Sequence, residues 1–295
     1  MYMPYHIQVG GAFKKGKQEK IKQIIEESFA LVDQIYNHWN PDSELSKINN
    51  LPAHTTIPIS PKMFELLHVT DKVVHLSGNS FDPTLGRVIQ LWKESLKEGT
   101  VPSEETLNFL KPRLGWKHVH FTENSFSKDF EEIYLDLDGI AKGMAVEIIV
   151  KNLNTAGFKN VYAEWAGEIK TTGVHPDGRK WIIMILNPIA ADPKEQVIDK
   201  IALQDRAIAT SGDYLQYWEI NGKYYSHIID KNNLHPMEIR KGSIASATVA
   251  ANFCPFADGL ATAALTKKNE EEVKEWIAAV KQSHPDVSFW IVTRS

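Results

Sequence analysis

The stretch Ile133–Gly157, IYLDLDGIAKGMAVEIIVKNLNTAG, joins a strand pattern to a helix pattern through a short segment that contains two glycines. Apolar and polar side chains alternate over Ile133–Leu137, as in a half-buried strand. A helix is expected from Met144 to Ala156, with Gly157 as the C′ residue that ends it. The stretch therefore predicts a strand followed by a helix, with Asp138–Gly143 as the turn between them.

The segment Asp136–Gly143 (DLDGIAKG) carries the first group of residues suited to binding a ligand. Glycines at the start of a helix let the backbone approach a ligand closely, and the free amides there favour phosphate. Lys142 adds a point charge that suits a phosphoryl oxygen. Neither a Walker loop nor a Gly-x-Gly-x-x-Gly fingerprint is present, so an ordinary turn with a solvated lysine remains the alternative.

Patterns on both sides of this stretch indicate a mixture of helices and strands. Apolar residues spaced by three and four positions predict helices at Lys17–Asn40, Pro61–Ser77, a segment through Trp92 after the turn Gly78–Thr84, Ala257–Thr266 and Glu270–Gln282. Short β-like runs are expected at Lys117–Phe121, within Asn160–Asn187 and Val197–Ile229, and at Val287–Val292, whereas the rest of Leu107–Phe121 looks irregular. Because helices and strands are segregated rather than strictly alternating, the predicted fold class is α+β, with residues 1–295 forming one domain.

The composition allows a large buried core and excludes several classes of protein. The chain has 295 residues, of which 43% are hydrophobic and 24% are charged. A net charge of −4 argues against a nucleic-acid-binding protein, and no apolar run of about 18 residues could span a membrane. The single cysteine, Cys254, excludes an intramolecular disulfide and lies among apolar neighbours, so we expect it to be a buried packing residue.

A second group of polar residues, within Ala257–Thr262 (ADGLAT), contains a carboxylate and a hydroxyl four positions apart. On a helix, Asp258 and Thr262 share a face, and they offer the hard oxygen ligands that Mg²⁺ prefers. The alternative is structural, with an acidic residue favoured by the helix dipole and a threonine bonded back to a carbonyl. For the pair in isolation, the structural alternative is favoured.

Two further groups supply a candidate base and candidate aromatic contacts. His227, within Ser226–Asp230, lies at the end of an alternating strand, where a histidine can accept a proton near neutral pH. A hydrogen-bonded loop histidine is the alternative. Trp39 and Phe81 could stack on a flat heterocycle, although Phe81–Thr84 also fits an ordinary turn.

The order of these groups along the chain is more informative than any one of them. The segments are Trp39–Asn49 (WNPDSELSKIN), Phe81–Gly86 (FDPTLG), Asp136–Gly143, Ala209–Tyr214 (ATSGDY), His227–Asp230 (HIID) and Ala257–Thr262. This series resembles the ApbE-like FAD:protein FMN transferase family. The resemblance covers the chain from about Tyr5 to Val292.

The resemblance implies a T-fold-like ApbE architecture, with two closely packed lobes and a flavin groove between them. It also implies Mg²⁺ as a cofactor and FAD as a substrate. The implied metal ligands are the carbonyl of Ala141 and the side chains of Asp258 and Thr262. The residues that match FAD-binding positions are Trp39, Ser80, Phe81, Asp82, Asp136, Lys142 and Ile229. His227 matches the candidate catalytic base of the family.

The implied reaction transfers FMN from FAD to a Ser or Thr hydroxyl of an acceptor flavoprotein and releases AMP. Cleavage of a pyrophosphate needs charge neutralisation, and the incoming hydroxyl needs a base. Two alternatives remain: a Mg²⁺-dependent FAD pyrophosphatase that forms FMN and AMP, and a non-catalytic flavin-binding or carrier protein. The intact His227, Asp258 and Thr262 argue against the carrier.

Two loops depart from the family pattern, and the expected location depends on the family. The family's Asn-x-Gly-Gly-Asp loop is replaced by Glu164–Glu168 (EWAGE), and Lys231–His235 (KNNLH) replaces a Pro and Gly after His-Ile-Ile-Asp. Many relatives are exported and lipid-anchored on the periplasmic side of the bacterial inner membrane, so the same location is expected. Met1–Val9 has no basic and apolar leader, so either a leader was removed or the protein is not exported, and a cytoplasmic location stays open.

Overall fold

The computed structural model describes residues 4–11 and 16–295. By their contacts these form two compact units: unit 1, made of the described residues up to Val32, Gly139–Tyr214 and Lys241–Ser295, and unit 2, made of Asp33–Asp138 and Leu215–Arg240. Met1–Met3, which belong to the segment on which the leader prediction depends, lie outside the described residues. Over the two described ranges, no helix combines the length and apolarity needed to cross a bilayer.

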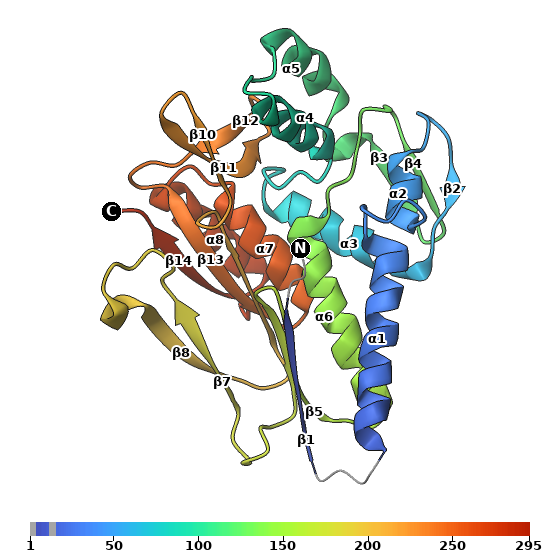
Figure 1. Ribbon diagram of the computed structural model, residues 1–295, viewed down its shortest axis with the longest axis vertical. Helices are drawn as coiled ribbons and strands as arrows, with labels where there is room; N and C mark the ends of the chain where they lie inside the picture. The colour runs from blue at the N-terminus through green and yellow to red at the C-terminus, as the bar shows by residue number, and fades with distance from the viewer. Residues whose placement is uncertain (1–3, 12–15) are drawn as a thin grey trace. The chain divides into compact units, whose positions relative to one another are not determined.

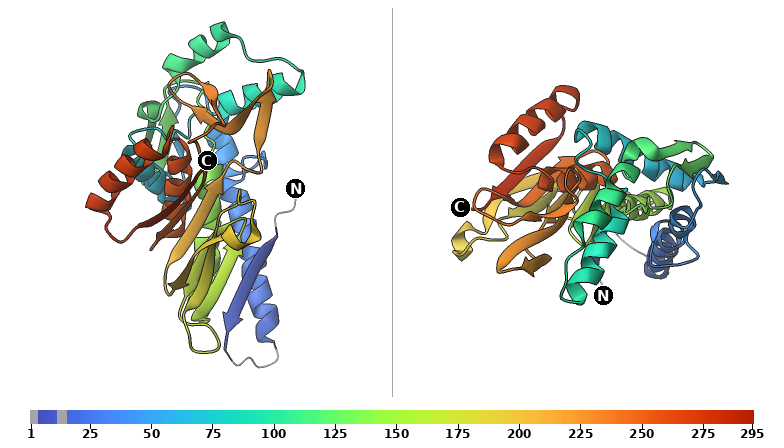
Figure 2. Two further views of the ribbon diagram at one scale, coloured as in Figure 1. Left: turned by 90° about the vertical axis from the view of Figure 1, so that its left-hand side faces the viewer. Right: turned by 90° about the horizontal axis from the view of Figure 1, so that it is seen from above.

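Unit 1 is built on a six-stranded antiparallel sheet (Figure 1). In spatial order its strands are β1 (Tyr5–Gly10), β5 (Asn160–Trp165), β6 (Glu168–Thr172), β9 (Ala207–Gly212), β13 (Ile244–Ala251) and β14 (Ser288–Thr293). The two edges are β1 and β14 (Figure 2). Every residue of β13 is buried, so this strand lacks the alternation from which a strand is usually predicted, and it was missed.

The sheet of unit 1 is covered by helices on one face and by a hairpin on the other. The helices are α1 (Lys17–Tyr36), α6 (Asp138–Thr155), α7 (Cys254–Leu265) and α8 (Glu270–Ser283). The hairpin consists of β7 (Trp181–Leu186) and β8 (Val197–Leu203), with the 3₁₀ turn η3 (Pro193–Glu195) in its loop. Ala207 packs with residues of α1, α6 and α7, whereas its neighbour Ile208 packs with the hairpin. Alternate residues of β9 thus serve two separate cores.

Unit 2 contains further helices and two small antiparallel sheets. The helices are α2 (Glu44–Asn49), α3 (Pro61–Leu76), α4 (Gly86–Lys97), α5 (Glu104–Leu110), η1 (Lys111–Arg113) and η2 (Trp116–His118). One sheet has the order β2 (Ile57–Pro58), β4 (Ser125–Lys128), β3 (Val119–Thr122), and the other β10 (Tyr217–Ile220), β11 (Lys223–Asp230), β12 (His235–Glu238). The indole Nε1 of Trp92 donates to the carbonyl of Leu234 at 2.8 Å, which ties α4 to the second sheet.

The predicted strand Ile133–Leu137 is wrong, because within the described ranges this segment belongs to no sheet. The side chain of Asn49 takes the place of a neighbouring strand: its Oδ1 accepts from the amide of Leu135 at 2.7 Å, and its Nδ2 donates to the same residue's carbonyl at 3.0 Å. Tyr134 forms an isolated bridge with Leu85, outside the named strands. The alternation of apolar residues reflects the burial of one face. An extended segment can bury one face in the same way as a strand, so the pattern does not distinguish the two.

Several other boundaries also differ from the prediction. Helix α6 starts at Asp138 rather than Met144, and α7 starts at Cys254 rather than Ala257, with Pro255 in the first turn, where a missing amide hydrogen is harmless. The region predicted to be irregular holds α5, and the neighbouring strand β4 was not predicted. The α+β class is confirmed, and so is the burial of Cys254. The flavin groove expected from the resemblance stays a prediction.

Candidate functional site

The residues predicted to form the site divide between the two units. Unit 1 holds Ala141, Lys142, Asp258 and Thr262. Unit 2 holds Trp39, Ser80, Phe81, Asp82, Asp136, His227 and Ile229. The four residues of unit 1 come from only two helices, α6 and α7.

Two glycines of α6 allow α7 to approach it closely. A Cβ atom added to Gly143 would lie 2.7 Å from the carbonyl oxygen of Cys254, and one added to Gly139 would lie 2.9 Å from the side chain of Thr262. Both distances are shorter than van der Waals contact, so a larger residue at either position would push the helices apart. The sequence suggested that these glycines let the backbone approach a ligand. In the structure they allow the close approach of α7, which carries Asp258.

Asp258 is completely buried at this helix crossing. Its Oδ2 accepts a hydrogen bond from the backbone amide of Gly143 at 2.8 Å. Its Oδ1 lies 3.7 Å from Nζ of Lys142 and has no hydrogen-bond partner among the described residues. Burial raises the pKa of Asp258, which the Lys142 ammonium and the Gly143 amide oppose. The alternative role for Asp258 was a stabilising interaction with the dipole of its own helix, α7. This role does not hold, because the carboxylate bonds to the first turns of α6 instead.

Thr262 lies one turn after Asp258, on the same face of α7. Its Oγ1 donates to the carbonyl of Gly139 at 3.2 Å and lies 3.1 Å from Oγ of Ser211 on β9. Ala141 lies in the first turn of α6, beside Lys142. The crossing thus brings Asp258 and Thr262 against the first turns of α6, the helix that carries Ala141.

Glu168, at the start of β6, completes the site and was noticed in the sequence only as a departure from the family loop. Its side chain is fully buried, and its Oε1 lies 2.8 Å from Nζ of Lys142. Burial raises the pKa of Glu168; the Lys142 ammonium opposes this shift and the Asp258 carboxylate adds to it. Lys142, Glu168 and Asp258 are called the buried charge cluster below.

The turn that precedes Glu168 has a left-handed backbone. Ala166 and Gly167 connect β5 to β6 with positive φ angles of 56° and 106°. A two-residue hairpin turn of this kind requires left-handed backbone at both positions, which is costly for alanine. Trp165 and Glu168 nevertheless pair directly across the hairpin. Ala166 therefore holds its place in this turn at the expense of backbone strain.

The residues predicted to hold Mg²⁺ fit a hard cation. Asp258 offers a buried carboxylate oxygen that lacks a hydrogen bond among the described residues, and Thr262 offers a hydroxyl on the same helix face. Within residues 4–11 and 16–295, no group of three or more His, Cys, Asp or Glu side chains could hold a metal ion. A cation beside Asp258 would therefore also need carbonyl, hydroxyl, water or phosphate oxygens, as Mg²⁺ commonly does.

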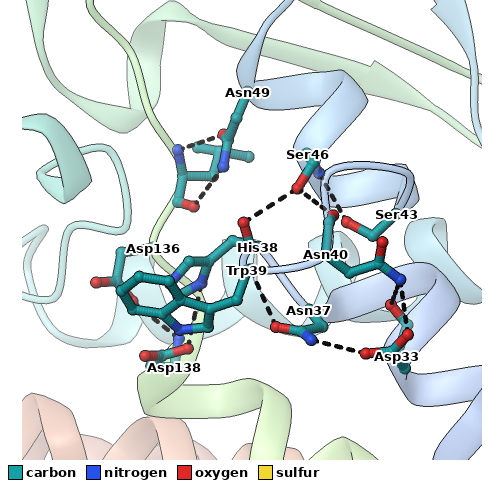
Figure 3. A network of polar contacts seen from close by, with 11 residues as sticks. Asp33, Asn37, His38, Trp39, Asn40, Ser43, Ser46, Asn49, Asp136 and Asp138 are labelled. Atoms are coloured by element: carbon teal, nitrogen blue, oxygen red, sulfur yellow. Dashed lines mark hydrogen bonds and ion pairs between the residues drawn. The ribbon is translucent and has the colours of Figure 1, made fainter.

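In unit 2, Trp39 is strongly exposed beside a network of polar contacts (Figure 3). Its side chain is 77% exposed, although tryptophan is usually largely buried. The ring lies 4.8 Å from that of His38, whose Nδ1 is 3.5 Å from Oδ1 of Asp138. Asp136 accepts from the amide of Asp138 at 3.0 Å. This position suits a ring that stacks on a flat ligand, as predicted for Trp39.

The predicted FAD-binding segment Ser80–Asp82 adopts the ordinary turn that the sequence also allowed. Ser80 donates to the carbonyl of Ser77 at 3.0 Å, and Asp82 accepts from the amide and hydroxyl of Thr84 at 3.0 and 2.6 Å. Burial raises the pKa of Asp82, which these hydrogen bonds oppose. The side chain of Phe81 is buried, unlike that of Trp39. Contact of this segment with FAD stays a prediction.

His227 lies on β11 and lines a cavity of about 630 Å³. The other lining residues are Lys93, Leu215, Gln216, Tyr217 and Trp218. Nδ1 of His227 is 3.1 Å from the carbonyl oxygen of Gln216, and a carbonyl can only accept, so Nδ1 carries the hydrogen. In the neutral ring Nε2 then keeps its lone pair, as a proton acceptor requires. Ile229, predicted to line the ligand site, is buried.

Comparisons with known proteins agree on one family. Residues 1–288 match the model of the ApbE family. A Chlamydia pneumoniae protein named FAD:protein FMN transferase is 36% identical over 274 residues, which cover 92% of this chain and 84% of that protein. Its namesake from Chlamydia trachomatis is 37% identical over 279 residues, covering 94% and 85%.

Solved structures agree with the sequence comparisons. A variant of the flavin transferase ApbE from Vibrio cholerae matches with a TM-score of 0.83 and 28% identity, covering 99% of this chain and 90% of that one. The flavinyl transferase ApbE from Pseudomonas stutzeri in its apo form matches with a TM-score of 0.81 and 26% identity, covering 99% and 92%.

Proposed function

The chain belongs to the ApbE family, and on this basis we propose that it is a magnesium-dependent FAD:protein FMN transferase. Its substrate would be FAD, and the acceptor would be a Ser or Thr hydroxyl of another protein. The two Chlamydia relatives described above, which carry this activity in their names, align over more than nine tenths of the chain. The structural observation that carries the proposal is the α6–α7 crossing, which gathers Lys142, Asp258 and Thr262 in one unit.

The charges at this crossing suit a pyrophosphate substrate. Lys142 offers an ammonium to a phosphoryl oxygen. Ala141, Asp258 and Thr262 would hold the metal, which when bound would neutralise negative charge on the pyrophosphate. In unit 2, the exposed ring of Trp39 is available for stacking on a flavin or an adenine.

The chemical step needs one proton transfer that the chain can supply. The oxygen of the acceptor hydroxyl forms a bond to the FMN-side phosphorus, and the bond from that phosphorus to the bridging oxygen breaks, so AMP leaves. The hydroxyl proton passes to a base, because a neutral hydroxyl is a poor nucleophile near pH 7. We assign this role to Nε2 of His227, the nitrogen opposite the one that bonds to Gln216.

The test is to incubate the protein with FAD, Mg²⁺ and a candidate acceptor, and to follow AMP by chromatography and the acceptor by mass spectrometry. A transferase releases AMP and adds FMN to the acceptor in equal amounts. AMP and free FMN without modified acceptor would indicate the pyrophosphatase alternative. FAD that binds but yields no AMP would indicate a flavin carrier and would contradict the proposal.

Replacing the proposed base gives a sharper test of His227. His227→Ala should bind FAD and Mg²⁺ normally but transfer FMN about 10²- to 10⁴-fold more slowly, which is the usual contribution of a general base. Single-turnover transfer at saturating FAD measures this. His235→Ala is the matched control, because His235 lies on the neighbouring strand β12 and pairs with Glu104. A near-normal rate in His227→Ala would remove this residue from the mechanism.

The expected location of the enzyme is part of the same proposal. Family resemblance implies action on the periplasmic side of the inner membrane, with a lipid anchor. Fractionation of cells that express the complete native gene would test this. Recovery of the enzyme in the cytoplasmic fraction alone would contradict it.

A further inference from the structure

The ammonium of Lys142 lies between two buried carboxylates. Its Nζ is 2.8 Å from Oε1 of Glu168 and 3.7 Å from Oδ1 of Asp258. Both carboxylates are 0% exposed, whereas the Lys142 side chain is 27% exposed. Each carboxylate also has a buried oxygen, Oδ1 of Asp258 and Oε2 of Glu168, without a hydrogen bond among the described residues.

These two carboxylates require a positive charge nearby. Ionised carboxylates without water or a counter-ion are strongly disfavoured in a protein interior. Lys142 supplies one positive charge against two negative ones, so the buried charge cluster keeps a net negative charge when all three groups are ionised. The oxygens without hydrogen bonds mark acceptor capacity that the ammonium leaves unused.

Lys142 is suited to leave this position. Its flexible four-carbon stem carries a compact charge, and the partial exposure of its side chain gives the ammonium a way towards water. A divalent cation beside Oδ1 of Asp258 would stand within a few ångströms of the ammonium. Like charges at that distance repel, so the metal and the ammonium compete for the negative charge of Asp258.

We propose that Lys142 is an internal counter-cation that neutralises Asp258 and Glu168 until Mg²⁺ binds beside Asp258 and displaces it. Glu168 is then a positioning residue that holds the ammonium close to the metal site. The inference deepens the proposed function and rests on it, because it takes Asp258 as the metal ligand. It adds that the lysine expected to meet phosphate also balances the charge of the two buried carboxylates.

A simpler role for Lys142 predicts a different result. If Lys142 only binds phosphate, its removal weakens FAD and leaves the affinity for the metal alone unchanged. If it competes with the metal, its removal raises the affinity for the metal alone. The distinguishing measurement is therefore a metal titration without FAD.

The experiment uses the full chain, stripped of metal with a chelator and titrated with Mg²⁺ by calorimetry and by thermal melting. Lys142→Met should melt lower than wild type in chelator, bind Mg²⁺ about tenfold more tightly, and gain more in Tm on adding Mg²⁺. Lys142→Arg keeps the charge and should retain wild-type metal affinity. Lys151→Met makes the same substitution at an exposed position of α6 and is the matched control.

A second pair of variants covers the case in which Lys142→Met does not fold. Glu168→Gln removes one carboxylate, so the double variant Lys142→Met with Glu168→Gln leaves a single buried carboxylate in the cluster. The double variant should bind Mg²⁺ more tightly than Glu168→Gln alone. Equal or weaker binding after loss of Lys142 in either background, or no Mg²⁺ binding by any variant, would overturn the inference.

The outcome is independent of the transfer assay. The titration contains neither FAD nor an acceptor. If transfer is absent but the loss of Lys142 tightens metal binding, the proposed function fails and the competition stands. If transfer occurs and the loss of Lys142 leaves metal affinity unchanged, only the competition fails.

Discussion

Lys128 and Lys142, one buried and one partly exposed, are held by partners that differ in kind. Lys128 on β4 of unit 2 is 1% exposed and donates to the backbone carbonyls of Asn49 and Ile133 at 2.7 and 2.8 Å. Lys142 on α6 of unit 1 is held by the carboxylates of Glu168 and Asp258. Neutral carbonyls bind an ammonium without cancelling its charge, whereas carboxylates cancel it.

The difference separates a structural lysine from the one for which we propose a functional role. Lys128 joins Asn49 to Ile133, next to the paired hydrogen bonds by which the Asn49 side chain holds Leu135. Its task is to fix an extended segment that no sheet contains within the described ranges. The partners of Lys142 keep oxygens that can accept another cation. Buried charge with spare acceptors indicates ligand binding more strongly than burial alone.

The largest expected effect tests the carboxylate side of this comparison. Asp258→Asn should lower FMN transfer by at least about 100-fold at limiting Mg²⁺, because an amide supplies only a neutral oxygen to the metal. The fold should persist, since the amide oxygen can still accept from Gly143. Steady-state rates and circular dichroism measure the two quantities. Normal turnover at limiting Mg²⁺ would show that the metal site lies elsewhere.

The next effect concerns Lys128 and the pH dependence of stability. Burial lowers the pKa of Lys128 from 10.5 to about 8, against the opposing influence of Glu131 and Glu132. Between these two values the unfolded chain binds more protons than the folded one, so the free energy of unfolding rises with pH. The expected gain is about 2 kcal/mol from about pH 7 to about pH 9.5.

Urea denaturation across that pH range measures the gain. Lys128→Met removes the titrating group, so this variant should lack the rise whatever its stability at neutral pH. An equal rise in both proteins would assign it to other groups. The contrast would then fail, because Lys128 would not carry an uncompensated charge as the comparison with Lys142 requires.

A smaller effect tests whether Lys142 also meets phosphate once FAD is present. Lys142→Ala should weaken FAD about tenfold and leave riboflavin almost unchanged, because riboflavin has no phosphate for the ammonium to contact. Fluorescence titrations with both ligands in the presence of Mg²⁺ provide the comparison, with Lys151→Ala as the control. Equal losses for the two ligands would limit Lys142 to its role inside the cluster.

The smallest effect concerns the strained turn that leads to Glu168. Ala166→Gly should raise the free energy of unfolding by about 0.5–1 kcal/mol, because glycine adopts the φ of 56° without a Cβ clash. Metal affinity should not change, since the register of Trp165 with Glu168 is kept. A loss of stability would mean that the methyl group of Ala166 makes a packing contribution larger than the strain.

Local patterns predicted much of this chain correctly. Three- and four-residue spacing predicted α1, α3 and α8, and the same spacing placed Asp258 and Thr262 on one face of a helix. The apolar surroundings of Cys254 predicted its burial. The helix predictions depend on residues a few positions apart, because the geometry of a helix is the same in every protein.

What the sequence by itself determined was which residues share a helix face, which segments are apolar, and which ordered series of motifs resembles the family. Only the tertiary structure decided their partners. Glu168 meets Lys142 across 26 positions, Asp258 meets Gly143 across 115, and Asn49 replaces a strand beside Leu135 across 86. Such pairs leave no periodic trace in the sequence, because they arise only when the packing of helices and sheet removes water and leaves polar groups to satisfy one another.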